Sequence, residues 1–437
     1  MSNRIFITFL GTGIYAKRND EIGYETVKYE FEDGRSNYTP FAQVATVEWI
    51  GVENIDRYLV LITKESRDKH WDLLVEAWNK VGVSSDLIVP ILISTDQSKE
   101  AQWGWFQELF HHVDTGDKLS FDFTHGFRSV PILFSTAINF LQKSKGVELK
   151  HAFYGYVEYG KSVGEMIDMA DFYRINDWAD GVVALVDSAD PTKLNRLAEE
   201  EDESSPFGSI NNPKLIAELD KLSLQIGSVD VENVAKTART ACRLIRKQQD
   251  SDSSKPDQFL LNMLLDKFVP LAQKTTKYYD WTYFTMQCTL IEVLFEHRFY
   301  MQAFTAMREL MGTIGLPYLV DVENLDIMSQ SRQFHRAYAD LFFTMCQIAE
   351  KRWEFTTMYA NNPKKMTRFN HLLVVWQAFT RDEKDSLFDL SQTISKLRNG
   401  FDHAWLGKKG VPPDVQKRCS ECLSALRDLL IQLKLMA

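Results

Sequence analysis

The sequence predicts an α/β Rossmann-like domain in the first part of the chain, followed by an all-α helical domain. Two observations carry this prediction. Short apolar runs alternate with helical patterns over about the first 160 residues, whereas the second half reads almost entirely as amphipathic helix. Strands that are apolar on both faces and separated by helices are typical of a parallel sheet that helices cover on both sides.

The apolar runs of the first half are expected to be the strands of a parallel or mostly parallel sheet. Helical segments such as "SRDKHWDLLVEAWNKV" lie between them. After Gly164 the strand pattern stops, and residues 165–198 look helical. The predicted strands are "RIFITFLGTG", "RYLVLITK", "DLIVPILIS", "KLSFDFTHG" and "VELKHAFYGYV".

The second half is expected to contain helices only. From Pro213 onward, segments such as "IEVLFEHRFYMQAFTAMRELM" carry apolar residues at helical spacing, and no fixed-period repeat suggests a solenoid. The preceding "AEEEDESSPFGSINNP" reads as a solvated surface loop. The sequence therefore predicts an α/β domain over residues 1–164, a helical linker region over 165–250 and a helical domain over 251–437.

Composition limits the classes of partner and compartment. The formal net charge of −10 argues against a protein that coats duplex DNA, although a local basic cleft for RNA is compatible with it. No apolar run approaches the roughly 18 residues of a membrane span, and the start lacks the features of a signal peptide, so a cytoplasmic protein without membrane contact is expected. The five cysteines suit reduced thiols, and for the lone Cys419/Cys422 pair packing is favoured over a zinc or redox role.

Small, polar or basic residues follow three of the predicted strands. Ligands of open α/β sheets bind at the carboxyl ends of the strands, and the third segment leads into a helix whose first turn holds Pro131. Glycine amides, a lysine, and an arginine with neighbouring hydroxyls at a helix start suit a phosphate-bearing ligand. This reading is favoured over ordinary strand-to-helix connections with a surface arginine. The candidate residues are Gly11, Thr12, Gly13, Thr63, Lys64, Thr124, His125, Gly126, Phe127, Arg128 and Ser129.

Other nucleotide chemistries find no support in the sequence. GxGxxG and P-loop lysine motifs are absent, and so is an acidic residue in the context that a dinucleotide ribose requires, which argues against redox and NTPase functions. His125 has no acidic or nucleophilic partner that the sequence identifies. A ligand contact or a structural role is therefore favoured for it over general acid catalysis.

A second candidate site lies on a helix near the end of the chain, in "SKLRNGFDHAWLG". The apolar series Leu387, Leu390, Ile394 and Leu397 predicts a helix that carries Arg398 and His403, while Gly400 suggests a kink or a close backbone approach. Imidazole can move a proton near neutral pH and guanidinium can stabilise a phosphorane-like transition state, so RNA cleavage through the 2′-hydroxyl needs no metal. Asn399 can bind a phosphate or orient its neighbours. The alternative is a surface arginine beside a capping or packed histidine.

The two sets of motifs resemble a known family. "FLGTGIY" and "FDFTHGFRSVP" are similar to the CARF sensor domain, and "RNGFDH" is similar to the R-x4-6-H motif of HEPN ribonucleases. Their order resembles that of the CRISPR-associated accessory ribonucleases of type III systems, which join a CARF domain to a HEPN domain. Residues 165–250 carry no motif of the family.

The resemblance implies a homodimer, or a higher oligomer, that acts in antiviral defence as an endoribonuclease. Paired CARF domains would bind the allosteric activator cyclic oligoadenylate through the strand-end residues named above. Cyclic tetra-adenylate is expected as the activator in preference to cyclic hexa-adenylate. Arg398 and His403 of both protomers, supported by Asn399, would then cut single-stranded RNA and leave a 2′,3′-cyclic phosphate. No cofactor or metal is implied. Two other readings stay open: a non-catalytic nucleotide sensor or interaction module, and an ungated, toxin-like ribonuclease.

Overall fold

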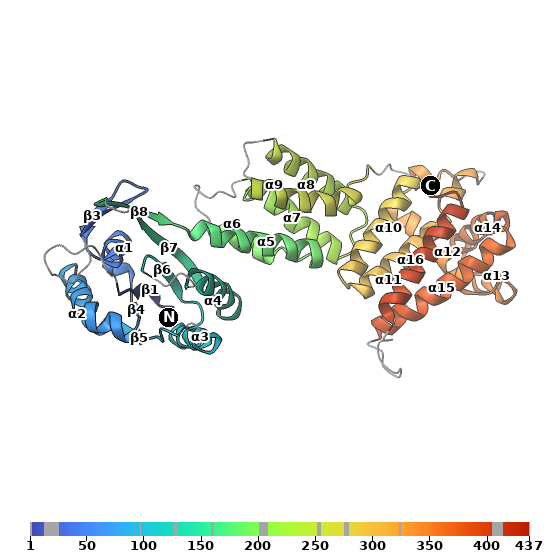
Figure 1. Ribbon diagram of the computed structural model, residues 1–437. Coiled ribbons are helices and arrows are strands. Elements are labelled where there is room, and N and C mark those ends of the chain that lie inside the picture. Colours follow the sequence, from blue (N-terminus) through green and yellow to red (C-terminus); the bar gives the residue numbers. More distant parts are fainter. Residues whose placement is uncertain are drawn as a thin grey trace. The chain divides into compact units, whose positions relative to one another are not determined.

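The computed structural model describes residues 2–12, 26–96, 98–125, 130–158, 161–200, 209–250, 255–274, 279–322, 325–403 and 414–436 (Figure 1). The chain divides into two compact units, residues 1–176 and 177–437. The first unit is α/β and the second is helical, as the sequence predicts.

An eight-stranded, mostly parallel sheet forms the centre of the first unit as far as it is described. Five neighbouring strands run in one direction in the order β5-β4-β1-β6-β7, which is the strand order of a doubly wound sheet. All five strands that the apolar runs predict are present. In sheet order the strands are β3 (Ser36–Thr39), β2 (Val27–Phe31), β8 (Val163–Asp168), β7 (Glu148–Val157), β6 (Lys118–Asp122), β1 (Arg4–Leu10), β4 (Arg57–Ile62) and β5 (Ile88–Leu92).

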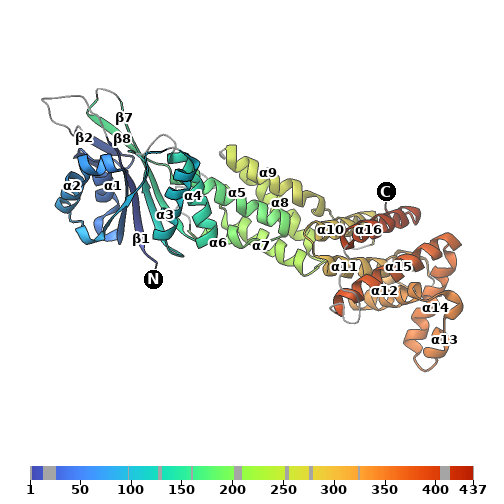
Figure 2. The same cartoon turned by 60° about the horizontal axis from the view of Figure 1, so that its bottom comes forward.

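Helices cover both faces of this sheet. Figure 2 shows α1 (Ala42–Ile50) and α2 (Lys64–Lys80) on one side, with α3 (Lys99–His112) and α4 (Val130–Lys145) on the other. Alternate residues of β1 enter two separate apolar cores: Phe6 packs on the α1/α2 side and Ile7 on the α3/α4 side. Burial on both faces explains why the central strands read as continuous apolar runs.

Three strands at one side of the sheet were not predicted. The hairpin of β2 and β3 and most of β8 alternate buried with exposed residues, and they lack the continuous apolar run that marks the central strands. The expectation of helix from residue 165 was wrong, because β8 continues to Asp168 and pairs antiparallel with β7. The predicted domain end at Gly164 lies inside this strand.

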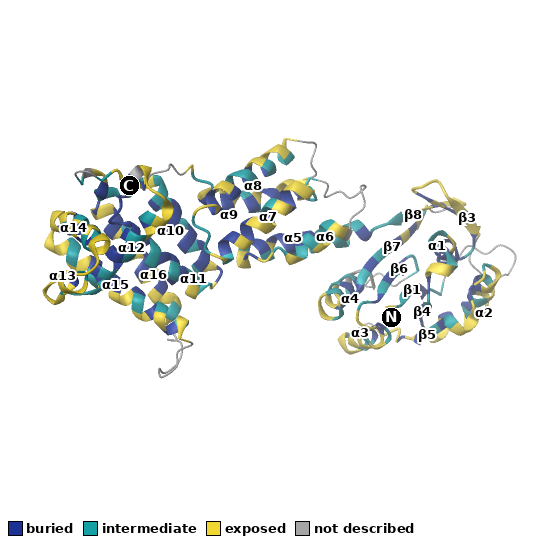
Figure 3. Ribbon diagram, turned by 180° about the vertical axis from the view of Figure 1, so that it is seen from behind, coloured by how far each residue is buried: buried dark blue, intermediate teal, exposed yellow. Residues whose placement is uncertain are grey.

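The second unit is a set of packed amphipathic helices. Figure 3 shows their buried residues turned toward neighbouring helices and their exposed residues on the outer sides. The helix α15 packs against α11, α12 and α16. The helices, of which α5 begins in the first unit, are α5 (Ala170–Ser188), α6 (Thr192–Glu200), α7 (Pro213–Gly227), α8 (Val234–Gln249), α9 (Lys255–Phe268), α10 (Trp281–Glu296), α11 (Tyr300–Thr313), α12 (Arg332–Gln347), α13 (Phe355–Met358), α14 (Pro363–Ala378), α15 (Arg381–Asp402) and α16 (Val415–Gln432).

All five cysteines are buried and none forms a disulfide. Cys419 and Cys422 lie one turn apart on α16, and burial raises the pKa of Cys419 to about 12 and that of Cys422 to about 11. These thiols are protonated and packed, as the sequence favoured. Within the described ranges, no helix is long and apolar enough to cross a membrane.

Candidate functional site

The strand ends singled out in the sequence meet at one edge of the sheet. The strand β1 lies between β4 and β6 and is parallel to both, so their carboxyl ends point the same way. The winding changes direction between β1 and β6, which is where ligands of doubly wound sheets bind. The described candidates that follow these three strands are Gly11, Thr12, Thr63, Lys64, Thr124 and His125, whereas Gly13, Gly126, Phe127, Arg128 and Ser129 lie outside the described residues.

The amino end of α2 contributes two of the candidates in different ways. Thr63 is buried and caps the helix: its Oγ1 accepts a hydrogen bond from the amide of Ser66 at 3.1 Å, while the Ser66 hydroxyl accepts one from the Thr63 amide at 2.9 Å. Lys64 is the first residue of α2 and is exposed. Of the two, Lys64 presents its side chain outward, at a helix end that favours anions.

Lys64 lines a hollow of about 510 Å³ between the ends of β4 and β5. Ser94 and Thr95 add two hydroxyls to its wall, and Glu65 and Asp68 add carboxylates. The sequence reading did not include Ser94 and Thr95. The signal for them was a pair of hydroxyl residues at the end of the predicted strand "DLIVPILIS": Ser94 is its last residue and Thr95 follows directly. A phosphate in this hollow would meet hydrogen-bond donors and one lysine, while the two carboxylates give the lining a formal charge of −1.

Two histidines lie together at this edge. His70 of α2 is buried, and its Nε2 is 3.5 Å from the carbonyl oxygen of Thr12. Burial lowers the pKa of His70, and burial with a smaller effect of His70 lowers the pKa of His125 to about 4. Both rings are neutral at pH 7 and can therefore form hydrogen bonds without adding positive charge. The sequence reading missed His70, although it is a polar residue on the buried face of a predicted helix.

A buried carboxylate supports the turn that follows β6. Asp122 accepts a hydrogen bond from the Thr124 amide at 2.9 Å, and the Thr46 hydroxyl lies 3.4 Å from its other oxygen. Burial raises the pKa of Asp122 to about 6. The Thr124 Oγ1 in turn accepts a hydrogen bond from the Gly155 amide at 2.8 Å, which ties the end of β6 to β7. Asp122 and Thr124 thus hold the segment that leads to His125.

The second candidate site is the last turn of α15. The predicted series Leu387, Leu390, Ile394 and Leu397 is buried, and the helix continues through the buried Gly400 to Asp402. Phe401 stacks on Tyr300 and Phe304 of α11, with ring centroids 6.4 Å and 6.1 Å away. The end of α15 is therefore fixed against α11 by aromatic contacts.

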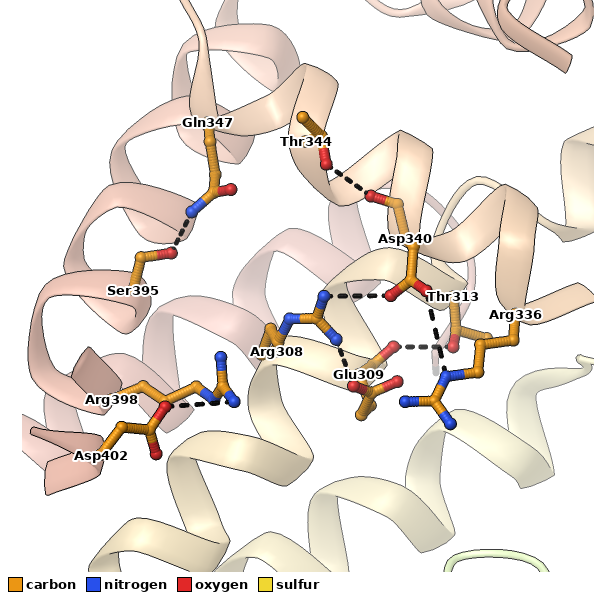
Figure 4. Close-up of polar contacts among 10 residues, drawn as sticks. All are labelled: Arg308, Glu309, Thr313, Arg336, Asp340, Thr344, Gln347, Ser395, Arg398 and Asp402. Atoms are coloured by element: carbon orange, nitrogen blue, oxygen red, sulfur yellow. Dashed lines mark hydrogen bonds and ion pairs between the residues drawn. The ribbon is translucent and has the colours of Figure 1, made fainter. Parts of the chain in front are cut away.

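The positions of Arg398 and His403 lie on different sides of α15. Five helical steps of about 100° place the two positions roughly 140° apart around the axis. His403 is exposed, and its amide donates a hydrogen bond to the Asn399 carbonyl at 3.2 Å as the helix ends. Asn399 is exposed, whereas the half-buried Arg398 forms an ion pair with Asp402 (Figure 4). A single protomer therefore does not bring the arginine and the imidazole onto one face.

Ligands for a metal ion are not gathered at either site. In the described part of the chain, no group of three or more His, Cys, Asp or Glu side chains is arranged to hold a metal. Among these residues, the candidate sites contain hydrogen-bonding groups, the positive charges of Lys64 and Arg398, and the imidazole of His403.

Comparison with known proteins gives one informative similarity. No protein-family model matches the chain. The chain is 27% identical over 176 residues to the CRISPR-associated protein MJ1674 of Methanocaldococcus jannaschii. The alignment covers 40% of this chain and 26% of that protein, so the chain spans only about a quarter of its length. The similarity supports a relation of this chain to CRISPR-associated proteins.

Proposed function

We propose that this chain is a metal-independent endoribonuclease that cyclic oligoadenylate activates and that cuts single-stranded RNA in type III CRISPR antiviral defence. One observation carries the proposal: a doubly wound sheet with polar strand ends and an R-x4-H helix end occur in the same chain. The similarity to a CRISPR-associated protein supports the biological setting.

The first unit is the sensor in this proposal. Lys64 and the amino end of α2 attract phosphates of the messenger, and the hydroxyls of Ser94 and Thr95 donate hydrogen bonds to them. The neutral ring of His125 suits a hydrogen bond to adenine or ribose, and the buried His70 supports the segment of Thr12. Cyclic tetra-adenylate is the expected activator.

The second unit is the nuclease. His403 accepts the proton of the RNA 2′-hydroxyl, whose oxygen then attacks the adjacent phosphorus. A bond forms between the 2′-oxygen and phosphorus, and the bond from phosphorus to the 5′-oxygen breaks. The products are a 2′,3′-cyclic phosphate and a 5′-hydroxyl that takes up a proton from an imidazolium. Arg398 stabilises the negative charge of the transition state, and Asn399 orients the phosphate.

The active site is composite in this proposal. Because the positions of Arg398 and His403 lie on different sides of α15, the reacting phosphate lies between the helix ends of two protomers. Messenger binding then activates the enzyme by favouring the dimer arrangement in which those ends face each other. Such coupling requires that the messenger binds one arrangement more tightly than the other.

The test is cleavage of a fluorescent single-stranded RNA by the purified protein in the presence of a chelator. Three reactions are compared: one without a cyclic nucleotide, one with cyclic tetra-adenylate and one with cyclic hexa-adenylate. His403→Ala removes the proposed base, and His111→Ala, an exposed histidine of α3, serves as the matched control. Cleavage should require one ring, vanish in His403→Ala and persist in His111→Ala.

Three other outcomes would contradict the proposal. Ring binding without cleavage would indicate a non-catalytic sensor. Cleavage without any ring would indicate an ungated ribonuclease. Cleavage that survives in His403→Ala would place the activity elsewhere.

A further inference from the structure

We infer that Asp402 is a positioning residue that holds Arg398 in the orientation used for RNA cleavage. The inference rests on the proposed function and adds a residue to the same site. Figure 4 shows the side chain of Arg398 directed from α15 toward α11, with the carboxylate of Asp402 beside it. The Arg398 Nη2 lies 3.1 Å from the Asp402 Oδ2, one helical turn away.

The place of Asp402 argues against a role in helix stability. Asp402 is the last residue of α15, where the negative end of the helix dipole disfavours a carboxylate. The order of the pair, with arginine before aspartate, is also the less favourable one for an i,i+4 contact. Helix stability therefore does not explain an aspartate at position 402. Its ion pair with Arg398 does explain it.

Arg398 keeps hydrogen-bonding capacity after it has paired with Asp402. Its Nε is buried and, among the residues that the structure describes, has no hydrogen-bond partner. Its side chain is 32% exposed, so a phosphate can approach the rest of the guanidinium. The pair thus orients the group through one nitrogen and leaves other donors for an acceptor.

A neighbouring arginine shows the contrast. Arg308 of α11 pairs with Glu309 and, at 3.0 Å, with Asp340, and its guanidinium carbon lies 5.2 Å from the ring centre of Phe343. Figure 4 shows the two carboxylates at the Arg308 guanidinium. Together with the ring of Phe343 they give Arg308 the surroundings of a structural residue. Arg398 has one carboxylate, so its charge is only partly committed within the described residues.

The backbone that carries Arg398 is anchored to α11, because Phe401 in the last turn of α15 stacks on Tyr300 and Phe304. The remaining freedom is that of the arginine side chain itself, which has many rotamers in the absence of a partner. A solvent-accessible ion pair is weak, so Asp402 biases this side chain without preventing it from engaging a phosphate.

The experiment compares Asp402→Asn and Asp402→Glu with the unsubstituted protein in single-turnover and steady-state RNA cleavage. Asp402→Asn should lower kcat about tenfold and change KM less than about twofold, since orientation matters in the transition state. Asp402→Glu should restore most of the activity. The control is Asp385→Asn, which removes the carboxylate of another arginine-aspartate i,i+4 pair on α15 and should leave kcat unchanged.

A double-mutant cycle identifies the residue through which Asp402 acts. In an Arg398→Lys background, Asp402→Asn should lower kcat less than about twofold, because the group that it positions is gone. An equal loss in both backgrounds would overturn the inference. A shift of the pH profile of cleavage in Asp402→Asn would also overturn it, because the effect would then pass through His403.

A spectroscopic readout separates this inference from the proposed function. The ¹⁵N relaxation of the Arg398 Nε should report an ordered side chain in the native protein and a mobile one in Asp402→Asn. If no RNA is cleaved under any condition, the proposed function fails, and this measurement still supports or overturns the positioning of Arg398. Unchanged order in Asp402→Asn overturns it.

Discussion

Replacing Asp122 by asparagine should stabilise the first unit increasingly as the pH rises. The side chain is 1% exposed, and burial raises its pKa from 3.8 to about 6. Asparagine has nearly the same size and can accept the same hydrogen bond from the Thr124 amide, but it carries no charge. The substitution therefore isolates the cost of keeping a carboxylate ionised in the interior.

The sign and size follow from the pKa shift. Between pH 3.8 and about 6 the folded state binds more protons than the unfolded state, so the free energy of unfolding falls as the pH rises through this window. A shift of about two pKa units corresponds to roughly 3 kcal/mol, and roughly half of it falls between pH 5 and 8. Between pH 5 and 8, the free energy of unfolding of the native protein should therefore fall by roughly half of the total, relative to that of Asp122→Asn.

The assay is hydrogen exchange of peptides from β1 and β6 by mass spectrometry, which reports the opening of the first unit separately from the second. Rates are measured from pH 5 to 8 and corrected for intrinsic exchange. The free energy of opening of the first unit should be higher in Asp122→Asn than in the native protein, and this difference should grow by about 1.4 kcal/mol from pH 5 to 8. Asp72→Asn, at an exposed position of α2, is the control. An advantage that stays constant, or that shrinks with rising pH, would refute the reasoning.

Three further predictions concern single contacts. Lys64→Ala should weaken the affinity for cyclic tetra-adenylate about tenfold or more in calorimetry, because a charge-assisted contact is lost, whereas Lys80→Ala at the far end of α2 should not change it. Gly312→Ala should lower the thermal midpoint of the helical unit, since its Cβ would lie 2.6 Å from a backbone oxygen of α12; the control Gly227→Ala, with nothing within 4 Å, should not lower it. Thr63→Ala should destabilise the first unit by about 1 kcal/mol in chemical denaturation, while Thr63→Ser should keep the cap and most of the stability.

The amino-acid sequence alone determined the order of the two units and the location of both candidate sites. The apolar runs predicted the five central strands, and their parallel arrangement placed the residues after β1, β4 and β6 at one edge. The leucine series of α15 predicted the buried face of the helix that carries Arg398 and His403. These features were readable because burial on both faces of a strand and on one face of a helix leaves a local, periodic pattern.

Only the tertiary structure decided which distant residues meet. It placed His70 of α2 beside Thr12 and enclosed Asp122 beneath α1. It also paired β8 with β2, two strands that are far apart in the sequence and lack the continuous apolar run of the central strands. These contacts depend on how the sheet and its helices pack together, so the short-range pattern of residues cannot reveal them.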